Sequence, residues 1–230
     1  MKYLLIVSIA IIAALSNNTK AQERFADPIT YSADSSTGIK TDNDEIRHFY
    51  GNVVFRQRNV VLRCKEAIYS LVRKKAELLR DVVITQEDMV LKSPRIDYDG
   101  FTGIAVAPQT VTITDKNATL KARKGEYNTN TYIATFLNDV RIIDDSTTID
   151  SDTLIYNRRT RVSNAMGGVV VETDSIIIFA DSAENRPADR TNTAVGNVFL
   201  MAKFNSFFLN AGLTIDSRRD NTTLAYLSPI

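Results

Sequence analysis

Residues 53–81 read VVFRQRNVVLRCKEAIYSLVRKKAELLRD, and residues 82–110 read VVITQEDMVLKSPRIDYDGFTGIAVAPQT. Aligned without a gap, the two stretches match valine with valine, leucine with leucine and tyrosine with tyrosine at a spacing of 29 residues. The same spacing continues to Leu200. A fixed period of about 20 to 50 residues is typical of repeat proteins, in which each unit buries its apolar face only against its neighbours.

Four columns of this repeat are apolar or aromatic. The first contains only valine, the next two contain large apolar residues and the fourth contains only tyrosine. We predict that all four columns face the interior. Their members are Val53, Val82, Val111, Val140, Val169 and Val198; Phe55, Ile84, Ile113, Ile142, Val171 and Leu200; Leu62, Leu91, Leu120, Ile149 and Ile178; and Tyr69, Tyr98, Tyr127 and Tyr156.

Within each unit the apolar residues recur with a period of two, which is typical of half-buried strands. Val111 and Ile113, for example, alternate with Thr110, Thr112 and Thr114. Each unit is also interrupted twice by short polar runs rich in Asn, Asp, Gly, Lys or Arg, and such runs favour hairpin turns. We therefore predict four short strands per unit, and no helix after the N-terminal segment.

Two hairpins in each unit make the chain zigzag between two facing walls. We expect Val53–Arg56 and Val60–Cys64 to pair on one wall, and Ala67–Tyr69 and Ala76–Leu78 to pair on the other. The predicted fold is therefore all-β: an open trough of about six antiparallel repeats with an apolar interior. The alternative is that the two walls close completely and interdigitate as a sandwich core.

The repeat is less regular at its ends. Residues 27–50 contain a partial unit with a long polar insert, Asp34–Glu45, and regular repeats occupy residues 51–200. The last unit, residues 201–230, is irregular and has about two extra residues near Phe204–Phe208. We expect one repeat domain over residues 22–230.

The first 21 residues have the features of a secretory signal peptide. Lys2 precedes a mostly apolar run, Tyr3–Leu15, and the small residue Ala21 ends a polar segment. A membrane anchor is the alternative, but the run is shorter than the roughly 20 residues that span a bilayer. We expect cleavage after Ala21 and export of residues 22–230.

The composition argues against several classes of function. With 28 Lys plus Arg and 27 Asp plus Glu, the formal net charge is +1, which does not favour nucleic-acid binding. His48 is the only histidine, so neither a His-based catalytic triad nor a multi-His zinc site can form. We expect no enzyme activity, metal or cofactor. Cys64 is the only cysteine, and the equivalent Ser93 and Ala122 indicate a need for a small residue rather than a reactive thiol.

Basic residues are concentrated in the first full unit. Arg73, Lys74 and Lys75 are consecutive and lie in a predicted turn. They are candidates for contact with lipid phosphates or an acidic partner. The alternative is a solvated sheet edge.

The repeat resembles the OstA-like periplasmic proteins of the lipopolysaccharide transport bridge, the LptA class, over about residues 27 to 216. Most units lack the small-residue–Asp pair of that family, and the first full unit has Arg63-Cys64-Lys65 in its place. The residues that carry the resemblance are Gly51-Asn52-Val53, Gly196-Asn197-Val198, Ala33-Asp34, Ser151-Asp152, Ala180-Asp181 and the recurring tyrosine.

This resemblance implies an open β-jellyroll, or β-taco, whose apolar groove carries lipopolysaccharide acyl chains across the periplasm towards the outer membrane. The four columns would line the groove, and the partners would be similar β-taco domains at the two membranes. Open sheet edges also favour head-to-tail self-association, through the Ile29–Ala33 end and the Leu213–Leu227 end. The alternative function is a β-solenoid adhesin or glycan-binding scaffold. That class favours parallel coils or exposed aromatic platforms, and the sequence contains no Trp.

Overall fold

The computed structural model describes residues 29–115, 118–144, 147–186, 188–204, 207–217 and 222–226. Over these residues the chain consists of strands, turns and bends, so the all-β prediction is confirmed. No helix in the described part is long and apolar enough to cross a membrane. The predicted signal peptide, residues 1–21, lies outside the described residues.

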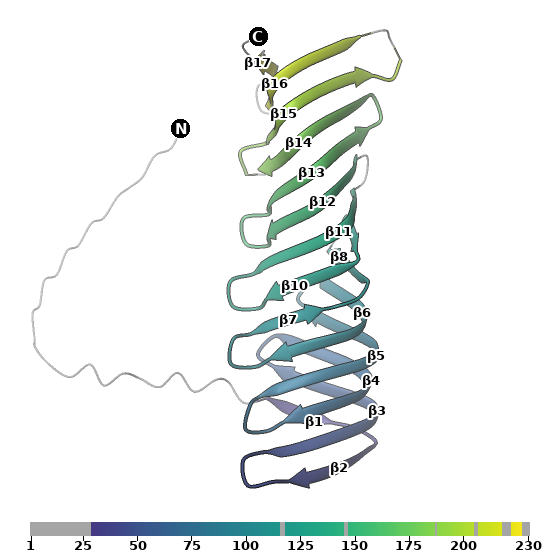
Figure 1. Cartoon of the computed structure of the whole chain (residues 1–230), viewed down its shortest axis with the longest axis vertical. Coiled ribbons are helices and arrows are strands. Elements are labelled where there is room, and N and C mark those ends of the chain that lie inside the picture. The colour runs from purple at the N-terminus through teal and green to yellow at the C-terminus, as the bar shows by residue number, and fades with distance from the viewer. Residues whose placement is uncertain are drawn as a thin grey trace, which may run out of the picture.

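The described residues form one antiparallel sheet, in which most strands pair with the strands that precede and follow them in sequence. The sheet is elongated, with β2 near one end and β17 at the other (Figure 1). The strands are β1 (Thr30–Ser32), β2 (Ser35–Lys40), β3 (Glu45–Gln57), β4 (Val60–Ser70), β5 (Lys75–Gln86), β6 (Met89–Asp99), β7 (Ile104–Ala107), β8 (Val111–Asp115), β9 (Ala118–Ala122), β10 (Lys124–Asn128), β11 (Ile133–Asp144), β12 (Thr147–Asn157), β13 (Val162–Thr173), β14 (Ile176–Arg186), β15 (Thr191–Ala202), β16 (Phe208–Ser217) and β17 (Thr222–Tyr226).

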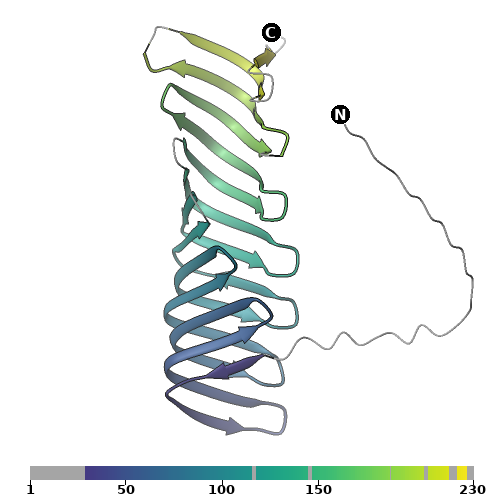
Figure 2. The ribbon, with the colours of Figure 1, turned by 180° about the vertical axis from the view of Figure 1, so that it is seen from behind.

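The sheet is folded along its length, so that each long strand contributes to both facing halves. The first half of β3 pairs with β2 and its second half pairs with β1, while β4 pairs with β3 on both sides of the bend. The prediction of four short strands per unit is therefore wrong for most units, which contain two long bent strands. Only between residues 104 and 128 are the long strands divided as predicted, into β7 and β8 and into β9 and β10. Figure 2 shows the folded strands from behind.

Two consecutive residues with positive φ mark the bend in alternate strands. They displace the register of pairing, as a β-bulge does, and allow the strand to turn while its two ends remain paired. Pro108, near the end of the second unit, lies between β7 and β8, where the strand is interrupted. The pairs are Gly51 and Asn52, Arg80 and Asp81, Asn138 and Asp139, Gly167 and Gly168, and Gly196 and Asn197.

At the inner corner of the fold, each valine of the first column pairs with a small residue. A small partner fits because the two walls are closest at the crease. Cys64 belongs to this set, which explains its size and its 6% exposure. The pairs are Val53 with Cys64, Val82 with Ser93, Val111 with Ala122, Val140 with Ser151, Val169 with Ala180, and Val198 with Ala211.

On the outer side of the corner, the residue that follows the small residue contacts a side chain in the bend of the next strand. Asn52 Nδ2 donates to Asp34 Oδ2 at 2.9 Å, and Asn197 donates to Asp181 in the same way. In the first full unit a basic residue takes the place of the Asp, and Lys65 forms an ion pair with Asp81. The Arg63-Cys64-Lys65 departure therefore keeps the contact across the bend.

The stretch Asp34–Glu45 is not an insert, because residues 35–40 form β2, which pairs with β3. All six residues of β2 are exposed, as expected for an end strand with one neighbour. Because neither face of β2 is buried, its sequence does not alternate between apolar and polar residues. β1 and β2 together make the first bent strand, and Asp34 lies at its bend.

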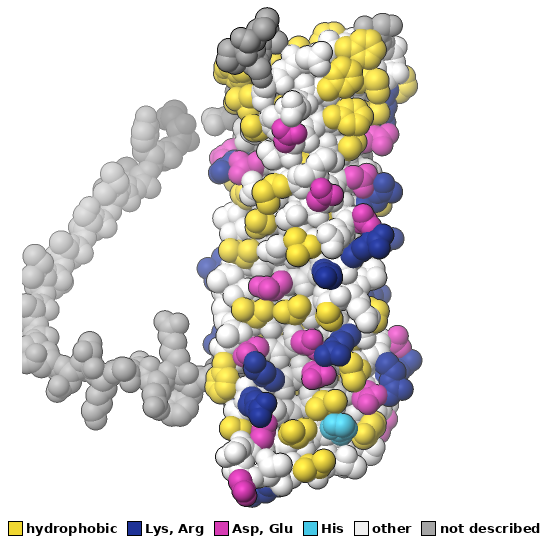
Figure 3. Space-filling view, viewed as in Figure 1, with side chains coloured by type: hydrophobic (Ala, Val, Ile, Leu, Met, Phe, Trp, Pro, Cys, Tyr) yellow, Lys and Arg dark blue, Asp and Glu magenta, His cyan; other side chains and the backbone are white. Residues whose placement is uncertain are grey.

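The outer surface carries charges of both signs along its length, and apolar side chains gather near the C-terminal end (Figure 3). Phe179, Phe199 and Phe208 form a row there, with ring centroids 6.2 and 5.9 Å apart. All three project from the outer face, because Phe179 pairs directly with Phe199 next to inward-facing Ile178 and Leu200.

Candidate functional site

The two halves of the folded sheet enclose the candidate site. We call the half that contains β8 and β9 wall A, and the half that contains β7 and β10 wall B. In an antiparallel sheet directly paired residues point to the same face, so pairing identifies the side chains that line the space between the walls.

Wall A has an apolar interior row along its whole length. Each member pairs directly with the next, from β3 to β16. The row combines two predicted columns and ends with a residue that the sequence analysis did not select, Leu209. Its members are Phe55, Leu62, Ile84, Leu91, Ile113, Leu120, Ile142, Ile149, Val171, Ile178, Leu200 and Leu209.

Wall B has two interior rows that change in character along the molecule. We call the edge of the two walls farthest from the bends the mouth. Near the mouth, tyrosine alternates with alanine as far as Tyr156, and polar residues follow. Nearer the corner, large residues give way to small ones. The mouth row is Tyr69, Ala76, Tyr98, Ala105, Tyr127, Ala134, Tyr156, Ser163, Asn185, Asn192 and Asp216; the deeper row includes Leu78, Ile96, Phe136, Leu154, Ala165, Ala183, Ala194 and Thr214.

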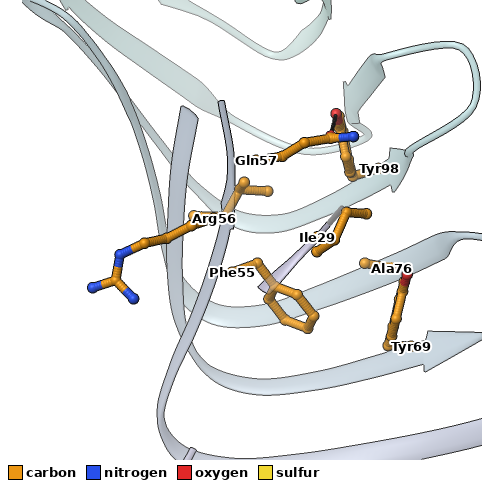
Figure 4. A pocket seen from close by; sticks show the side chains of 8 residues that line it. Ile29, Phe55, Arg56, Gln57, Tyr69, Ala76 and Tyr98 are labelled. Atoms are coloured by element: carbon orange, nitrogen blue, oxygen red, sulfur yellow. Dashed lines mark hydrogen bonds between the residues drawn. The ribbon is translucent and has the colours of Figure 1, made fainter. Parts of the chain in front are cut away.

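The N-terminal half of the interior is filled by the protein itself. Phe55 and Leu62 are 2% exposed, and Leu78 is fully buried. Ile29 points into the remaining space, between Phe55, Ala76 and Tyr98 (Figure 4). The cavity there measures about 10 Å³, roughly the room that one water molecule needs. For this half the closed sandwich alternative describes the interior better than an open trough.

Hydrogen bonds between the walls close the mouth of this half. Tyr98 donates to Gln57 Oε1 at 2.6 Å, and Tyr127 donates to Gln86 Oε1 at 2.7 Å. Burial raises the pKa of both phenols, that of Tyr127 to about 12. Both tyrosines therefore remain neutral donors at physiological pH.

Arg158 closes the last part of the mouth, where the filled half ends. Its Nη1 lies 3.0 Å from Glu87 Oε2, and its Nη2 donates to the Gln86 carbonyl oxygen at 3.2 Å. The Arg158 side chain is 11% exposed, and its Nε lies 3.8 Å from Asp115 Oδ2 without a hydrogen bond to the described residues. At the opposite end Arg47 donates to the Tyr31 hydroxyl at 2.9 Å and closes the first strand pair.

The C-terminal half of the interior is more open. Ile142, Ile149 and Tyr156 are half-buried, as are Val171 and Ile178, although their equivalents in the first units are fully buried. From β13 onwards wall B presents Ala, Ser, Asn and Thr to the apolar row of wall A, whereas β12 still carries Leu154 and Tyr156 there. In this half a row of large apolar side chains on wall A faces mostly small side chains on wall B, and we call the space between them the C-terminal half of the groove.

All the predicted groove residues face the interior, and they divide into two groups. The first group is buried in the filled half or in the corner and acts as core. The second lines the open half, and its binding role remains a prediction. The buried group is Val53, Phe55, Leu62, Tyr69, Val82, Ile84, Leu91, Tyr98, Val111, Ile113, Leu120, Tyr127, Val140, Val169 and Val198; the second group is Ile142, Ile149, Tyr156, Val171, Ile178 and Leu200, of which Leu200 is itself buried at 8% exposure.

Among the predicted basic residues, two have acidic partners. Arg73 Nε lies 3.4 Å from Asp44, and Lys75 Nζ lies 3.4 Å from Asp99. Arg73 and Lys74 lie in the turn between β4 and β5, and Lys75 is the first residue of β5; Arg73 and Lys75 are exposed, and Lys74 is half-buried. Their contact with phosphate or an acidic partner remains a prediction.

The described residues contain no cluster of three or more His, Cys, Asp or Glu that could bind a metal. His48 Nδ1 lies 3.1 Å from the hydroxyl of Tyr50 at the exposed surface. Burial raises the pKa of the Cys64 thiol to about 11. Cys64 is therefore a core residue in the structure.

Comparison with known proteins agrees with the repeat and the folded sheet. The family model described as OstA-like protein matches residues 29–181. The chain belongs to the OstA-like family. No curated protein matches it.

A similar solved structure is LptH from Pseudomonas aeruginosa, described as the LptA-homologous periplasmic component of the conserved lipopolysaccharide transport device. The match has 15% sequence identity and a TM-score of 0.28, and covers 61% of this chain and 83% of LptH. At this level of similarity the superposition does not establish a shared groove. The strand pairing and the family match identify the fold of this OstA-like chain.

Proposed function

We propose that this OstA-like protein is exported to the periplasm and carries lipopolysaccharide towards the outer membrane, with the acyl chains in the C-terminal half of the groove. The observation that carries the proposal is the half-exposed apolar row of wall A, which faces small side chains on wall B. Family membership and the description of LptH as a component of lipopolysaccharide transport support it. The proposed role involves no catalytic step.

The physical basis is the burial of hydrocarbon. Each methylene removed from water contributes about 0.8 kcal/mol, so an acyl chain along the open half would be held by many small contributions. The filled half offers no equivalent space, because side chains such as Leu78 and Phe136 already occupy it. We therefore locate the lipid path at β12 to β16.

Photo-crosslinking in cells tests this location. A photoreactive residue at Ile178 should capture lipopolysaccharide, whereas the adjacent Ile177, which faces outward, should not. Ile84 and Ile113, at 1% and 9% exposure, should capture much less than Ile178. Equal capture at Ile177 and Ile178, or stronger capture at Ile84, would contradict the proposal.

We further propose that the protein associates head to tail, with itself or with similarly folded domains at the two membranes. The supporting observation is that β2 is an exposed end strand, and the sheet ends with β16 and β17 at the other end. Thr214 in that region is 3% exposed and paired on both sides, so a proline there would test folding instead of association.

The double variant Thr37→Lys, Ile39→Lys places charges on the exposed end strand β2 and leaves its pairing with β3 intact. Sedimentation velocity should show sizes that increase with concentration for the natural chain and a monomer for this variant. A natural chain that stays monomeric and binds no partner domain would defeat the association proposal.

The turn bearing Arg73, Lys74 and Lys75 is proposed to contact lipid phosphate or an acidic partner. Charge reversal at Lys74 alone leaves the ion pairs of its two neighbours in place. This variant should weaken binding at low salt and reduce its salt dependence. Binding that is independent of salt, and equal in the variant, would identify the turn as a solvated edge.

A further inference from the structure

The outer surface of wall A is basic over the N-terminal half of the sheet. Directly paired residues point to the same side of a sheet, and the neighbours of inward-facing Phe55 and Leu62 point outward. The wall A strands from β3 to β9 therefore carry two outward rows, which we call the basic face. One row is Val54, Arg63, Val83, Lys92, Thr112 and Lys121, and the other is Arg56, Val61, Thr85, Val90, Thr114 and Thr119.

The basic face contains only valine, threonine, arginine and lysine. Its cations are exposed, and none of their side chains forms an ion pair or hydrogen bond with another residue that the structure describes. The side chain of Arg56 points away from the interior, as Figure 4 shows. This side of the N-terminal half faces the reader in Figure 2. The cations are Arg56, Arg63, Lys92 and Lys121.

Several acidic residues border the basic face, and these have basic partners. Asp81 and Asp139, at the corner, each form an ion pair. Glu87, beside a turn, contacts a guanidinium group from wall B. Asp150 follows the first row and accepts two hydrogen bonds from Arg141, at 2.6 and 3.0 Å. The basic face is therefore a region of local positive charge in a chain whose formal net charge is only +1.

We propose that the basic face docks on a membrane surface that contains anionic phospholipid headgroups. Arg63, Lys92 and Lys121 are each two strands apart, which is about 10 Å at the usual interstrand spacing. They form a line and not a cluster. A line of separate cations matches many headgroups spread over a surface better than one small anion. The short valine and threonine side chains between the cations do not hinder a close approach.

Two other partners fit the basic face less well. A single-stranded nucleic acid is bound by stacking of its bases on aromatic side chains, and the basic face has none. A second copy of the chain would need free carboxylates on its own outer surface. On the outer face of wall B, however, Glu77 and Asp97 both contact Arg95, and Glu66 contacts Arg80. These acids are already compensated.

The inference goes beyond the proposed function, because docking through the basic face does not require lipid in the groove. The rows run along the sheet, so docking would lay the N-terminal half of the molecule along the membrane surface. The groove residues of the C-terminal half belong to later strands, β12 to β16.

Co-sedimentation of residues 22–230 with lipid vesicles tests the proposal. The probes are vesicles of phosphatidylcholine with an equal part of phosphatidylglycerol, vesicles of phosphatidylcholine alone, and soluble polyglutamate. The test variant is Lys92→Gln with Lys121→Gln. The matched control is Lys40→Gln with Lys124→Gln, which removes the same charge from exposed residues on β2 and β10, away from the basic face.

We expect the natural chain to bind the mixed vesicles more tightly than phosphatidylcholine alone, and this binding should weaken as salt rises. The test variant should bind the mixed vesicles about tenfold more weakly, and the control variant should bind them as the natural chain does. A second variant, Arg56→Gln with Arg63→Gln, should show a similar loss.

Three results would overturn the inference. Equal weakening in the control variant would show that net charge alone attracts the protein. Equal binding of the natural chain to both kinds of vesicle would show that headgroup charge is not recognised. Binding of polyglutamate without binding of mixed vesicles would identify an acidic polypeptide as the partner. Crosslinking at Ile178 tests the groove separately, so capture of lipopolysaccharide by a chain that ignores vesicles would overturn only the docking proposal.

Discussion

At the scale of single residues, the bends depend on close contacts that only some side chains allow. Gly167 has a φ of +79°, and a Cβ at this residue would lie 2.6 Å from Asp152 Oδ2. Gly168 has a φ of +52°, and no atom of another residue lies within 4 Å of the position that a Cβ would occupy. Two adjacent glycines of the same bend therefore have different requirements.

We predict that Gly167→Ala lowers the free energy of unfolding by about 2 kcal/mol, from the positive φ and the contact with Asp152. Gly168→Asn should be tolerated, because Asn52 and Asn197 occupy the equivalent position with φ of 43° and 46°. Urea denaturation measures both. Equal effects of the two substitutions would contradict this assignment, and Asp152→Ala should recover part of the loss in Gly167→Ala.

Cys64 gives a second prediction at this scale. Its folded pKa of about 11 is above the value of about 8.5 for a free thiol, so the thiol is neutral at pH 8. Its contribution to stability is present below about pH 8.5 and is lost as the pH rises towards 11. Alkylation should be slow in native buffer at pH 8 and fast in urea. Fast alkylation of the native protein would show that the thiol is accessible.

The small side chain at Cys64 could be predicted from the sequence, because Ser93 and Ala122 share its column. The ion pair of Lys65 with Asp81 could not, because the two residues are brought together by the bend of the next strand. A departure from the family pattern in one strand is compensated in its neighbour, and only the pairing register makes this visible.

At the scale of strands, the mouth of the filled half is closed by bonds between the walls. Gln86 is 1% exposed and accepts from the Tyr127 hydroxyl, whereas Gln57 is only half-buried and accepts from Tyr98. Loss of the hydroxyl leaves the buried Gln86 Oε1 without this donor in the first case, while Gln86 Nε2 still donates to Asn59. In the second case water can replace the hydroxyl.

We predict that Tyr127→Phe lowers the free energy of unfolding by about 1 to 3 kcal/mol, and that Tyr98→Phe has a smaller effect. Thermal or urea unfolding of the two variants provides the measurement. If Tyr98→Phe proves the more damaging of the two, burial of the amide does not determine the strength of the closure.

The turns and the inward register of the strands were predictable, because a period of two and Asn/Asp/Gly-rich breaks are local signals. The continuity of the bent strands was not. Glycine signals the bend at Gly51 and Gly196, but Arg80 and Asn138 adopt positive φ without such a signal. The end strand β2 was missed for another reason, since its exposed residues have no apolar alternation.

At the scale of the whole molecule, the repeat produces an interior that is filled in one half and open in the other. Identical spacing along the chain suggested a uniform trough. The difference arises in the deeper row of wall B, where Leu78, Ile96 and Phe136 are followed by Ala165 and Ala183. Which of these side chains share a row becomes clear only once the strand pairing is known.

The central claim is that the C-terminal half of the groove carries the lipid. Hydrogen–deuterium exchange of residues 22–230, with and without lipopolysaccharide, tests it directly because it reports each strand separately. Without ligand, β3 to β6 should exchange more slowly than β12 to β16. On addition of lipopolysaccharide, β12 to β16 should gain protection while β3 to β6 change little. Protection confined to β3–β6, or spread evenly along the sheet, would contradict the account.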